Sequence, residues 1–334
     1  AKPLIATRRS VFVASGAVGA VLVAIGLAGH VGKGFEWRFD EESLLGLVSA
    51  REDRAAPTCN FDQNRTIQNH PQPECTLRNS EKIDVLLIGD SHMWALTEGM
   101  REILERERID YYSISHTSCL PLIGFRVFDG LKKFSCEKFL IDAFEWAKAS
   151  DVNTIVLTAR FPLYLRGNRF DNGEGGVEAG VCGFVDLITM EQSSCDDVQR
   201  QRRVLAAYET RIRELAEAFN VVLVYPIPEA GWNVPSYSFK NALFNDNYET
   251  LTTSYAAYRE RTQEVNGLFD RLISELPNVF GARVHEVVCS DETGRCINAD
   301  ENGVYYYDDD HLSNVGARLV APVILNAIEA ALGS

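Results

Sequence analysis

The sequence predicts an α/β fold: a three-layer α/β/α sandwich with a mainly parallel, five-stranded sheet, preceded by one transmembrane helix. Two observations lead to this prediction. From residue 81 onward, short apolar β runs alternate with amphipathic helical segments, a pattern that implies right-handed crossovers and helices on both faces of one sheet. Near the N-terminus, residues 11–31 form a long apolar run without a charged side chain.

The composition is that of a folded, acidic protein. The chain has 334 residues, of which 46% are hydrophobic and 24% charged, so it can bury a full-sized core and is not disordered over most of its length. Asp and Glu number 47 against 33 Lys and Arg, a formal net charge of −14. Such an acidic surface is poorly suited to a phosphate backbone, so we expect no nucleic-acid partner.

The apolar run over residues 11–31 is long enough to cross a bilayer, since about 1.5 Å of rise per residue brings it to the ~30 Å of the hydrocarbon core. The alternative is a secretory signal peptide, whose apolar region is typically only about 7–15 residues long. Lys2, Arg8 and Arg9 precede the run and acidic residues follow it, which predicts a cytoplasmic N-terminus and an external remainder. Because the chain begins at Ala1 without an initiator methionine, we expect it to be cut from a longer protein.

We therefore expect four segments along the chain: a cytoplasmic flank (1–10), a transmembrane helix (11–31), a polar extension outside the membrane (32–80) and a globular α/β domain (81–334). The extension is irregular in composition, with one short helix expected over Glu41–Ala50.

Within the globular domain, each expected element follows from an apolar pattern. Short apolar runs of the kind buried in parallel sheets predict strands at Ile83–Ile88, Tyr111–Ser115, Thr154–Thr158, Val221–Tyr225 and Ala282–Val287. Helical periodicity predicts helices at Met93–Arg108, Glu137–Ala149, Asp197–Phe219, Leu251–Leu276 and Ser313–Leu332. Residues 161–194 are Gly-rich and follow neither pattern, so we expect a long loop that acts as a binding lid.

All eight cysteines lie beyond the apolar run, and an even number in an exported domain suggests disulfides. A zinc site would need closely spaced CxxC pairs, which the sequence lacks, so we expect no metal there. Pairing of sequence neighbours would give Cys59–Cys75, Cys119–Cys136, Cys182–Cys195 and Cys289–Cys296, although spacing alone does not establish this connectivity.

The first expected strand leads directly into Gly89-Asp90-Ser91-His92. In α/β sheets the ligand lies beyond the carboxyl ends of the strands, and a helix N-terminus there offers amides that can stabilise an oxyanion. Ser91 is thus placed as a candidate nucleophile. The alternative is that Asp90 and Ser91 serve only as turn and helix-capping residues.

A second polar cluster precedes the last expected helix, where Asp308 and His311 are three residues apart. A serine nucleophile needs a base within hydrogen-bond reach, and the base needs an orienting group. Ser91, Asp308 and His311 supply all three. Two alternatives are a helix-capping Ser313 after a solvated acidic run, and a divalent-metal site formed by Asp308, Asp309, Asp310 and His311.

Two motifs make the chain resemble the SGNH/GDSL hydrolase superfamily over roughly residues 80–334: IGDSH, which begins at Ile88, and YxDDDHLSxxGA, which begins at Tyr306. More narrowly, it resembles the SGNH domain at the C-terminus of acyltransferase family 3 membrane proteins, which O-acetylate bacterial surface polysaccharides. This narrower resemblance rests on the preceding apolar helix, the paired cysteines, and the stretches GFEWRF from Gly34, TSCLPL from Thr117 and LTARF from Leu157.

The resemblance implies a flavodoxin-like sheet and a role for each triad residue: Ser91 as nucleophile, His311 as general base and Asp308 as its orienting partner. It also implies an oxyanion hole in which the Ser91 amide is joined by a Gly amide and an Asn side chain. This sequence departs from that pattern, because it has neither residue at the matching positions. The candidate substitutes are the backbone of Ser118 or Cys119 and the side chain of Arg160, which could instead pair with a core carboxylate.

Three further residues are candidates for binding the acceptor. Tyr164 and Arg166 belong to the expected lid, which a Cys182–Cys195 disulfide would hold, and Tyr307 lies beside the candidate triad. Aromatic side chains at such a position can form a platform for a carbohydrate, although they more often pack in a core.

The function implied is that of a membrane-tethered periplasmic O-acyltransferase, by resemblance an O-acetyltransferase, which modifies a surface polysaccharide or lipopolysaccharide sugar through a serine acyl-enzyme. An acyltransferase family 3 domain in the bacterial inner membrane would deliver the acyl group, by resemblance from acetyl-CoA, and the domain itself would need no cofactor. One alternative is a carbohydrate acetylesterase or deacetylase that uses the same triad. The other is a non-catalytic glycan-binding domain.

Overall fold

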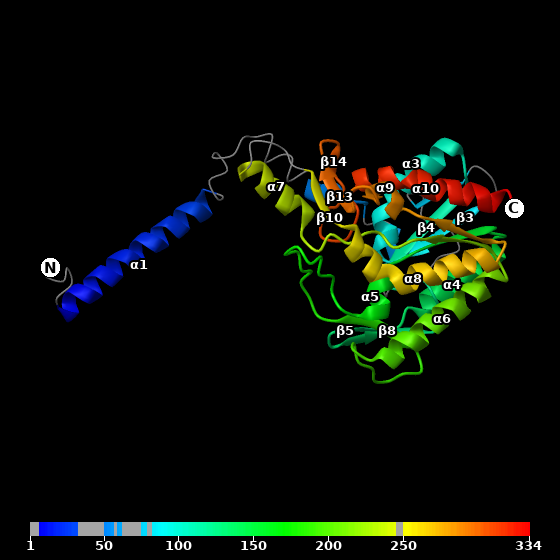
Figure 1. The fold of residues 1–334 in the computed structure, drawn as a ribbon, viewed down its shortest axis with the longest axis horizontal. Helices are drawn as coiled ribbons and strands as arrows, with labels where there is room; N and C mark the ends of the chain where they lie inside the picture. Colours follow the sequence, from blue (N-terminus) through cyan, green and yellow to red (C-terminus); the bar gives the residue numbers. More distant parts are fainter. Residues whose placement is uncertain (1–6, 33–49, 57–58, 62–74, 79–81, 245–249) are drawn as a thin grey trace. The chain divides into compact units, whose positions relative to one another are not determined.

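The computed structural model describes residues 7–32, 50–56, 59–61, 75–78, 82–244 and 250–334, and the chain separates into two compact units, Ala1–Val48 and Ser49–Ser334 (Figure 1). In the first unit, α1 spans Arg8–Val31 and Thr7 is its N-cap. The Thr7 side chain accepts the backbone N–H of Ser10, and the Ser10 side chain accepts the backbone N–H of Thr7. The apolar part of this helix has a mean hydropathy of 2.4, and none of its residues is buried. By length and composition the helix can therefore cross a membrane. The expected helix over Glu41–Ala50 lies almost wholly outside the described residues.

The second unit is built on the parallel sheet that the sequence predicts. Its strands run in the order β1-β4-β3-β7-β9-β11, and β2 pairs with β4 from the outside. The bounds are β1 (Asn60–Phe61), β2 (Thr76–Leu77), β3 (Val85–Gly89), β4 (Tyr111–His116), β7 (Thr154–Thr158), β9 (Asn220–Val224) and β11 (Val279–Ala282). Among the described strands of this sheet only β2 is antiparallel, and the two short strands β1 and β2 extend the five that were expected.

Helices cover both faces of this sheet (Figure 1). On one face lie α3 (Ser91–Glu107) and α10 (Asn314–Leu332); on the other lie α4 (Glu137–Ala149), α6 (Val198–Ala216) and α8 (Tyr255–Glu275). The first two approach closely, because a Cβ on Gly99 would lie 2.6 Å from the carbonyl carbon of Ala317. This arrangement confirms the three-layer α/β/α prediction.

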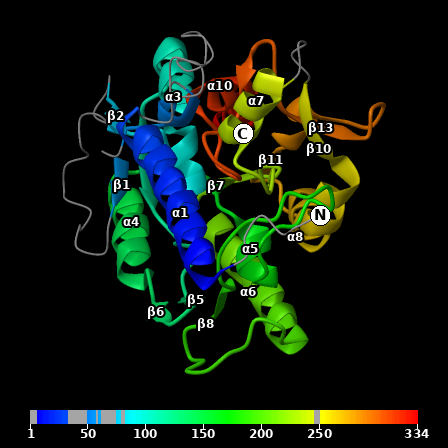
Figure 2. The same cartoon turned by 90° about the vertical axis from the view of Figure 1, so that its left-hand side faces the viewer.

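Two smaller antiparallel sheets were not predicted. One contains β6 (Lys132–Phe134), β5 (Phe125–Asp129) and β8 (Gly183–Leu187), and it lies against α5 (Phe161–Arg166) and α6 (Figure 2). The other contains β10 (Leu251–Ser254), β12 (Cys289–Ser290), β13 (Arg295–Asp300) and β14 (Gly303–Val304). The remaining helices are α7 (Val234–Phe244) and α9 (His285–Val288).

Three sequence predictions are corrected by these elements. The fifth strand was expected at Ala282–Val287, but it ends at Ala282, and α9 follows with His285 and Val288 buried. The helix expected from Leu251 begins at Tyr255, because the residues before it pair with β13 and Ser254 caps the helix. The stretch 161–194 is not an unpatterned loop, since it contains α5 and β8.

Four disulfides join all eight cysteines, in the pairs Cys59–Cys75, Cys119–Cys136, Cys182–Cys195 and Cys289–Cys296. Each closes a short loop of 7 to 17 residues in sequence separation. Loops tied in this way have less conformational freedom when unfolded, which favours the folded state.

Candidate active site

Ser91 lies at the junction between β3 and α3, at the carboxyl end of the central strand. The turn requires Gly89, because a Cβ there would lie 1.9 Å from the carbonyl oxygen of Thr158 on β7. Asp90 caps the helix by accepting a hydrogen bond from the His92 amide at 2.8 Å. As the first residue of α3, Ser91 has a backbone N–H with no intrahelical acceptor. Its hydroxyl and its amide therefore both lie at the positive end of the helix.

His311 reaches this serine from the loop before α10. Its Nε2 lies 2.8 Å from Ser91 Oγ, and its Nδ1 lies 2.8 Å from Asp308 Oδ2. The other carboxylate oxygen of Asp308 accepts the backbone amides of Asp310 and His311, at 3.1 and 2.8 Å, which fixes the loop. The three residues that the sequence singled out thus form a continuous nucleophile–base–carboxylate chain, with the geometry that acyl transfer to serine requires.

A second carboxylate, which was not predicted in this role, also lies at His311. Asp310 Oδ1 is 3.0 Å from Nδ1 of the imidazole. The other oxygen, Oδ2, is 3.1 Å from His92 Nε2 and 2.9 Å from Arg160 Nη1. Only the run of three aspartates signalled it in the sequence, where it was considered as a metal ligand.

The two carboxylates change the protonation of the base. Burial alone would lower the pKa of His311, but the charges of Asp310 and Asp308 outweigh it and raise this pKa well above the ordinary value. Burial would raise the pKa of Asp310, but Arg160 and then His311 hold it well below its usual range. The raised pKa favours the imidazolium form of His311, which must lose its extra proton before it can accept one from Ser91.

Arg160 is not an oxyanion donor, which corrects one tentative prediction. The residue is 7% exposed and its side chain pairs with core carboxylates, as the alternative proposed. Nε donates to Glu229 at 2.6 Å, and Nη1 and Nη2 donate to Glu178 at 2.9 and 2.5 Å. Asp310 on Nη1 and Glu229 on Nη2 complete the set, so all five N–H groups of Arg160 are engaged by carboxylates although the residue lines the pocket. Glu178 and Glu229 were not identified from the sequence, because no local pattern links them to Arg160.

Of the two backbone candidates for the oxyanion hole, the structure favours Ser118. The Cys119 amide donates to the carbonyl of His116 at 3.0 Å, so that prediction is wrong. Ser118 adopts a left-handed conformation, with φ of 61°, and lines the same pocket as Ser91. Within the described part of the chain we find no acceptor for its amide.

The pocket beside Ser91 has a volume of about 280 Å³, close to the lower end of the ~300–1,000 Å³ typical of small-molecule sites. Trp94 and Tyr307 form one part of its lining, and Asp129 and Arg169 another. A larger hollow of about 530 Å³ lies around Asn153 and Asn220, next to the amino ends of the strands and away from the triad. Because ligands of such sheets bind at the carboxyl ends, we assign the site to the smaller pocket.

The expected acceptor-binding residues differ in where they point. Tyr307 lines the pocket and its ring stacks on His311, with centroids 5.3 Å apart and planes 13° apart. Tyr164 also lines it, but its hydroxyl is committed to Asp90 Oδ2 at 2.9 Å. Arg166 does not line it: its guanidinium donates to the carbonyl of Glu260 at 2.6 Å and to Glu264 at 2.7 Å, so the prediction that it binds the acceptor is wrong. The sequence missed Trp94, which meets Tyr307 edge to face at 6.0 Å.

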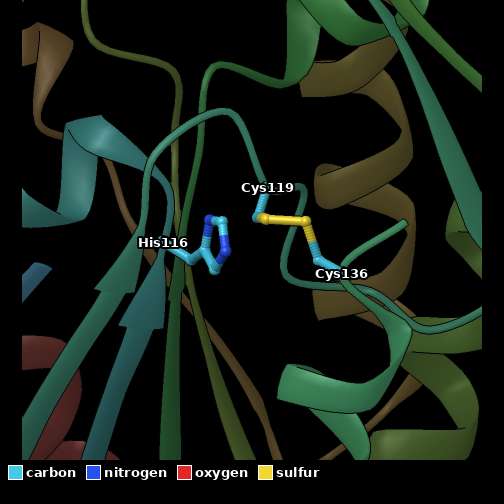
Figure 3. Close-up of side chains that lie close together, drawn as sticks. All are labelled: His116, Cys119 and Cys136. Carbon is cyan, nitrogen blue, oxygen red and sulfur yellow. A yellow bond between two sulfur atoms is a disulfide. The ribbon is translucent and has the colours of Figure 1, made fainter. Parts of the chain in front are cut away.

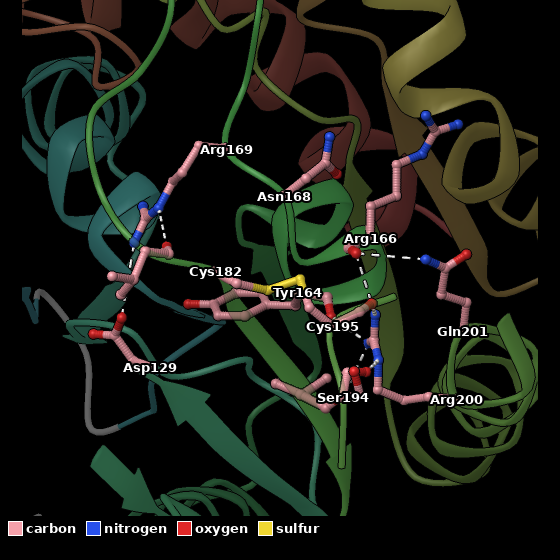
Figure 4. The surroundings of a disulfide bond; sticks show 12 residues. Asp129, Tyr164, Arg166, Asn168, Arg169, Cys182, Ser194, Cys195, Arg200 and Gln201 are labelled. Atoms are coloured by element: carbon pink, nitrogen blue, oxygen red, sulfur yellow. Dashed lines mark hydrogen bonds and ion pairs between the residues drawn. A yellow bond between two sulfur atoms is a disulfide. The ribbon is translucent and has the colours of Figure 1, made fainter. Parts of the chain in front are cut away.

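The expected lid is fastened by the Cys182–Cys195 disulfide and by a buried arginine (Figure 4). Gly167 passes so close that a Cβ there would lie 2.6 Å from the sulfur of Cys195. Arg200 is fully buried and donates to the carbonyl oxygens of Tyr164, Val185, Arg166, Ser194 and Cys195. These contacts tie the segment to α6 and β8 at the edge of the pocket.

Among the described residues, three groups of His, Cys, Asp or Glu lie close enough to hold a metal ion. In the first, His116 faces Cys119 and Cys136, but the two sulfurs are bonded to each other and offer no thiolate (Figure 3). The other two groups both contain Asp310, whose charge is already matched by Arg160. The donor sets therefore fit an ion pair better than a divalent cation.

Comparisons with known proteins agree with this fold. The family model of the SGNH domain fused to AT3 domains matches residues 58–326. No protein of curated function matches the chain by sequence. Among solved structures, the lipopolysaccharide acetyltransferase periplasmic domain of Salmonella ser. Paratyphi A matches with a TM-score of 0.51 at 16% identity, over 75% of this chain and 85% of that one. A member of the lipolytic protein G-D-S-L family from Veillonella parvula matches with a TM-score of 0.38 at 12% identity, over 73% and 96% of the two chains.

Proposed function

The chain belongs to the family of SGNH domains that are fused to AT3 domains, and on this premise we propose that it is an acyltransferase that acetylates a sugar hydroxyl through an acyl-enzyme at Ser91. The observation that carries the proposal is the 2.8 Å contact between Ser91 Oγ and His311 Nε2, with Asp308 on the other side of the imidazole. If Ser91 served only as a helix-capping residue, no imidazole would be needed at its hydroxyl.

In the first half-reaction, neutral His311 takes the proton of Ser91 Oγ while that oxygen attacks the carbonyl carbon of the acyl donor. The amides of Ser91 and Ser118 and the N-terminus of α3 stabilise the negative oxygen of the tetrahedral intermediate. When the intermediate collapses, the donor's leaving group departs with the proton held by His311, and the acyl group stays on Ser91. The imidazole is neutral again.

In the second half-reaction, a sugar hydroxyl occupies the pocket beside Trp94 and Tyr307 and gives its proton to His311 as it attacks the acyl carbon. A second tetrahedral intermediate forms and breaks toward the serine oxygen, which recovers the proton from His311. The products are the acylated sugar and free Ser91. With water in place of the sugar, the same steps make the enzyme an esterase.

The resemblance implies an Asn side chain as an oxyanion donor, but this chain has Arg160 there, and its donors are engaged by carboxylates. The oxyanion hole therefore lacks one donor, which bears on whether a sugar or water is the acceptor. Removing one oxyanion donor reduces the rate by roughly 10²–10³ in enzymes that depend on it. An activated acyl donor tolerates such a loss better than an unactivated ester does. This favours transfer from an activated donor over hydrolysis of an acetylated glycan.

The N-terminal helix supports a tethered arrangement. In this proposal residues 1–10 are cytoplasmic, 11–31 span the inner membrane, and 32–80 connect the span to a periplasmic catalytic domain over 81–334. The family's fusion to AT3 domains supplies the partner, a membrane domain that would bring the acyl group across the bilayer from acetyl-CoA. The catalytic domain itself uses only side chains and backbone amides.

The test is a transfer assay with the full chain in detergent micelles. A chromogenic acetyl ester is supplied with and without candidate polysaccharides, and Ser91→Ala is the control. We expect ester turnover that rises with glycan, and acetyl that appears on the glycan, both lost in Ser91→Ala. Equal turnover without transfer identifies an esterase, and full turnover in Ser91→Ala overturns the mechanism. No turnover, with no labelling of Ser91 by a fluorophosphonate, indicates a non-catalytic glycan-binding domain.

A further inference from the structure

Asp310 connects the catalytic histidine to a buried cluster of charges. Its carboxylate is divided between two sides: Oδ1 faces Nδ1 of His311 at 3.0 Å, while Oδ2 contacts His92 Nε2 and Arg160 Nη1 at 3.1 and 2.9 Å. The residue is 4% exposed, so its charge is little screened by water. Asp308, the other carboxylate at Nδ1, has a side chain that is 28% exposed.

The cluster behind Asp310 extends to the pocket wall. Arg160 is held by Glu178 and Glu229, and each of these acids has a second arginine partner. Arg169 donates to Glu178 at 2.7 Å, and Arg261 donates to Glu229 at 2.8 Å. Asp310 and the two glutamates thus balance the three arginines in charge. Since Arg169 also lines the pocket, the wall and the base are joined through consecutive ion pairs.

A buried cluster of this kind is poor evidence for a stabilising role. The desolvation of several charges commonly offsets their attraction, and apolar replacements of similar volume are often neutral or stabilising. What this cluster does achieve is to hold one carboxylate rigidly beside a reactive imidazole. A group so placed acts on the orientation and charge of that imidazole.

We propose that Asp310 is a positioning residue for the base: together with Asp308 it holds the imidazole of His311 with Nδ1 protonated and Nε2 toward Ser91, and Arg160 keeps it in place. The inference rests on the proposed function, since it concerns the same serine and histidine. Two carboxylates at one N–H stabilise the imidazolium that forms during the attack, and either one selects the same tautomer. Loss of Asp308 alone therefore leaves the base oriented.

The groups that face His311 determine how its protonation responds to substitution. They come from its own loop and the start of α3: Tyr307, Asp308, Asp310, Ser91 and His92. Arg160, after β7, and Asp309 act on these groups through Asp310. Burial together with Asp310 and Asp308 raises the pKa of Asp309 to about 6, so this carboxyl adds less negative charge below that pH. The buried charge of Asp310 favours the imidazolium more than any other group does, so its removal lowers the pKa of His311.

The experiment compares Asp308→Asn, Asp310→Asn and the double variant in the full chain. The readouts are the pH profile of kcat/KM for an acetyl ester and the rate of fluorophosphonate labelling. We expect Asp308→Asn to lose no more than about 100-fold, against the ~10⁴-fold that follows loss of a sole orienting carboxylate. Asp310→Asn is expected to move the acid limb of the profile down by about 1–3 pH units. The double variant should fall to the level of Ser91→Ala.

Asp291→Asn is the matched control, because it removes one negative charge from a side chain that is 78% exposed and paired only with Arg259 among the described residues. Its profile should overlay that of the parent. If Asp310→Asn does not fold, the double variant Arg160→Gln/Asp310→Asn replaces it, because it removes both charges of this ion pair. We expect the double variant to show the same shift of the acid limb.

Two results overturn the inference: an acid limb that does not move without Asp310, or an Asp308→Asn variant as inactive as Ser91→Ala. Neither result bears on the acyl-enzyme itself. Conversely, parental activity in Ser91→Ala overturns the proposed function whatever the aspartate variants do. The two claims therefore fail separately.

Discussion

Nε2 of His311 lies 2.8 Å from Oγ of Ser91, although 220 residues separate the two in sequence. The parallel sheet brings them together: Ser91 follows its central strand β3, and the loop that carries His311 leads into α10, which packs against α3. Because Asp308 fixes the loop through the amides of Asp310 and His311, the base already lies within hydrogen-bond reach of the serine. The behaviour expected of the enzyme and its variants follows from this contact and from the structure that supports it.

The pH dependence of the enzyme should reflect the two carboxylates at His311. The base works only after it has lost its proton, and its raised pKa delays that loss to higher pH. We expect kcat/KM to rise with pH through an apparent pKa clearly above the ~6.5 of an ordinary histidine. A pH profile measured with a chromogenic ester tests this. An acid limb at or below the ordinary value would contradict the assignment.

Trp94 should affect the acceptor more than the acyl donor. It lines the pocket beside Tyr307, and loss of an aromatic contact of this kind weakens binding by about 1 kcal/mol, or several-fold in KM. We expect Trp94→Leu to raise KM for the polysaccharide acceptor while fluorophosphonate labelling of Ser91 proceeds at the parental rate. A parallel loss of both would indicate that Trp94 only supports the fold around Ala56, whose carbonyl accepts its indole N–H at 2.9 Å.

Arg200 should be a determinant of stability. Its replacement by Met leaves five carbonyl groups without their donor. Because a buried polar group left unsatisfied costs about 1–3 kcal/mol, we expect the variant to lose at least about 3 kcal/mol of unfolding free energy. Urea unfolding with the disulfides intact measures this. Arg202→Met is the matched control on the exposed side of the same helix, with an expected change within about 0.5 kcal/mol. Equal stability of the two variants would show that Arg200 is not structural.

Gly99 should tolerate no side chain, because α3 and α10 meet there. A Cβ would lie 2.6 Å from backbone of Ala317, so Gly99→Ala must separate the helices and is expected to destabilise by about 1–3 kcal/mol. Gly267→Ala on α8 has no atom within 4 Å and should instead stabilise by up to about 1 kcal/mol, through helix propensity. In thermal unfolding, we expect Tm to fall for Gly99→Ala and to rise for Gly267→Ala. A stabilised Gly99→Ala would contradict the close packing.

The parts of the fold that could be predicted are those with local signals. The apolar run before Gly89 and the helical pattern after Ser91 indicate a strand, a turn and a helix, and the structure contains all three. The Asp308–His311 spacing is likewise visible, because both side chains belong to one short loop.

The position of the last strand was predicted wrongly, also because of a local pattern. The apolar residues after Ala282 were interpreted as a strand, but they form a turn of helix that buries Val288.

What could not be predicted depends on long-range side-chain contacts. Arg160 pairs with Glu178, Glu229 and Asp310 from three separate segments, and no pattern in the sequence links them. The direction of Arg166 has the same origin, since the carbonyl and carboxylate that it contacts belong to α8, far along the chain. Such contacts decide whether a charged residue faces the pocket or the core.

The central claim, a covalent acyl group on Ser91, is tested most directly by trapping that intermediate. The full chain in detergent is mixed with an activated acetyl ester, quenched in acid, and mapped by mass spectrometry of its peptides. The account predicts one acetyl on the peptide that contains Ser91, its loss when acceptor polysaccharide is added, and none in Ser91→Ala. Acetyl transfer to the polysaccharide at the parental rate in Ser91→Ala would contradict it.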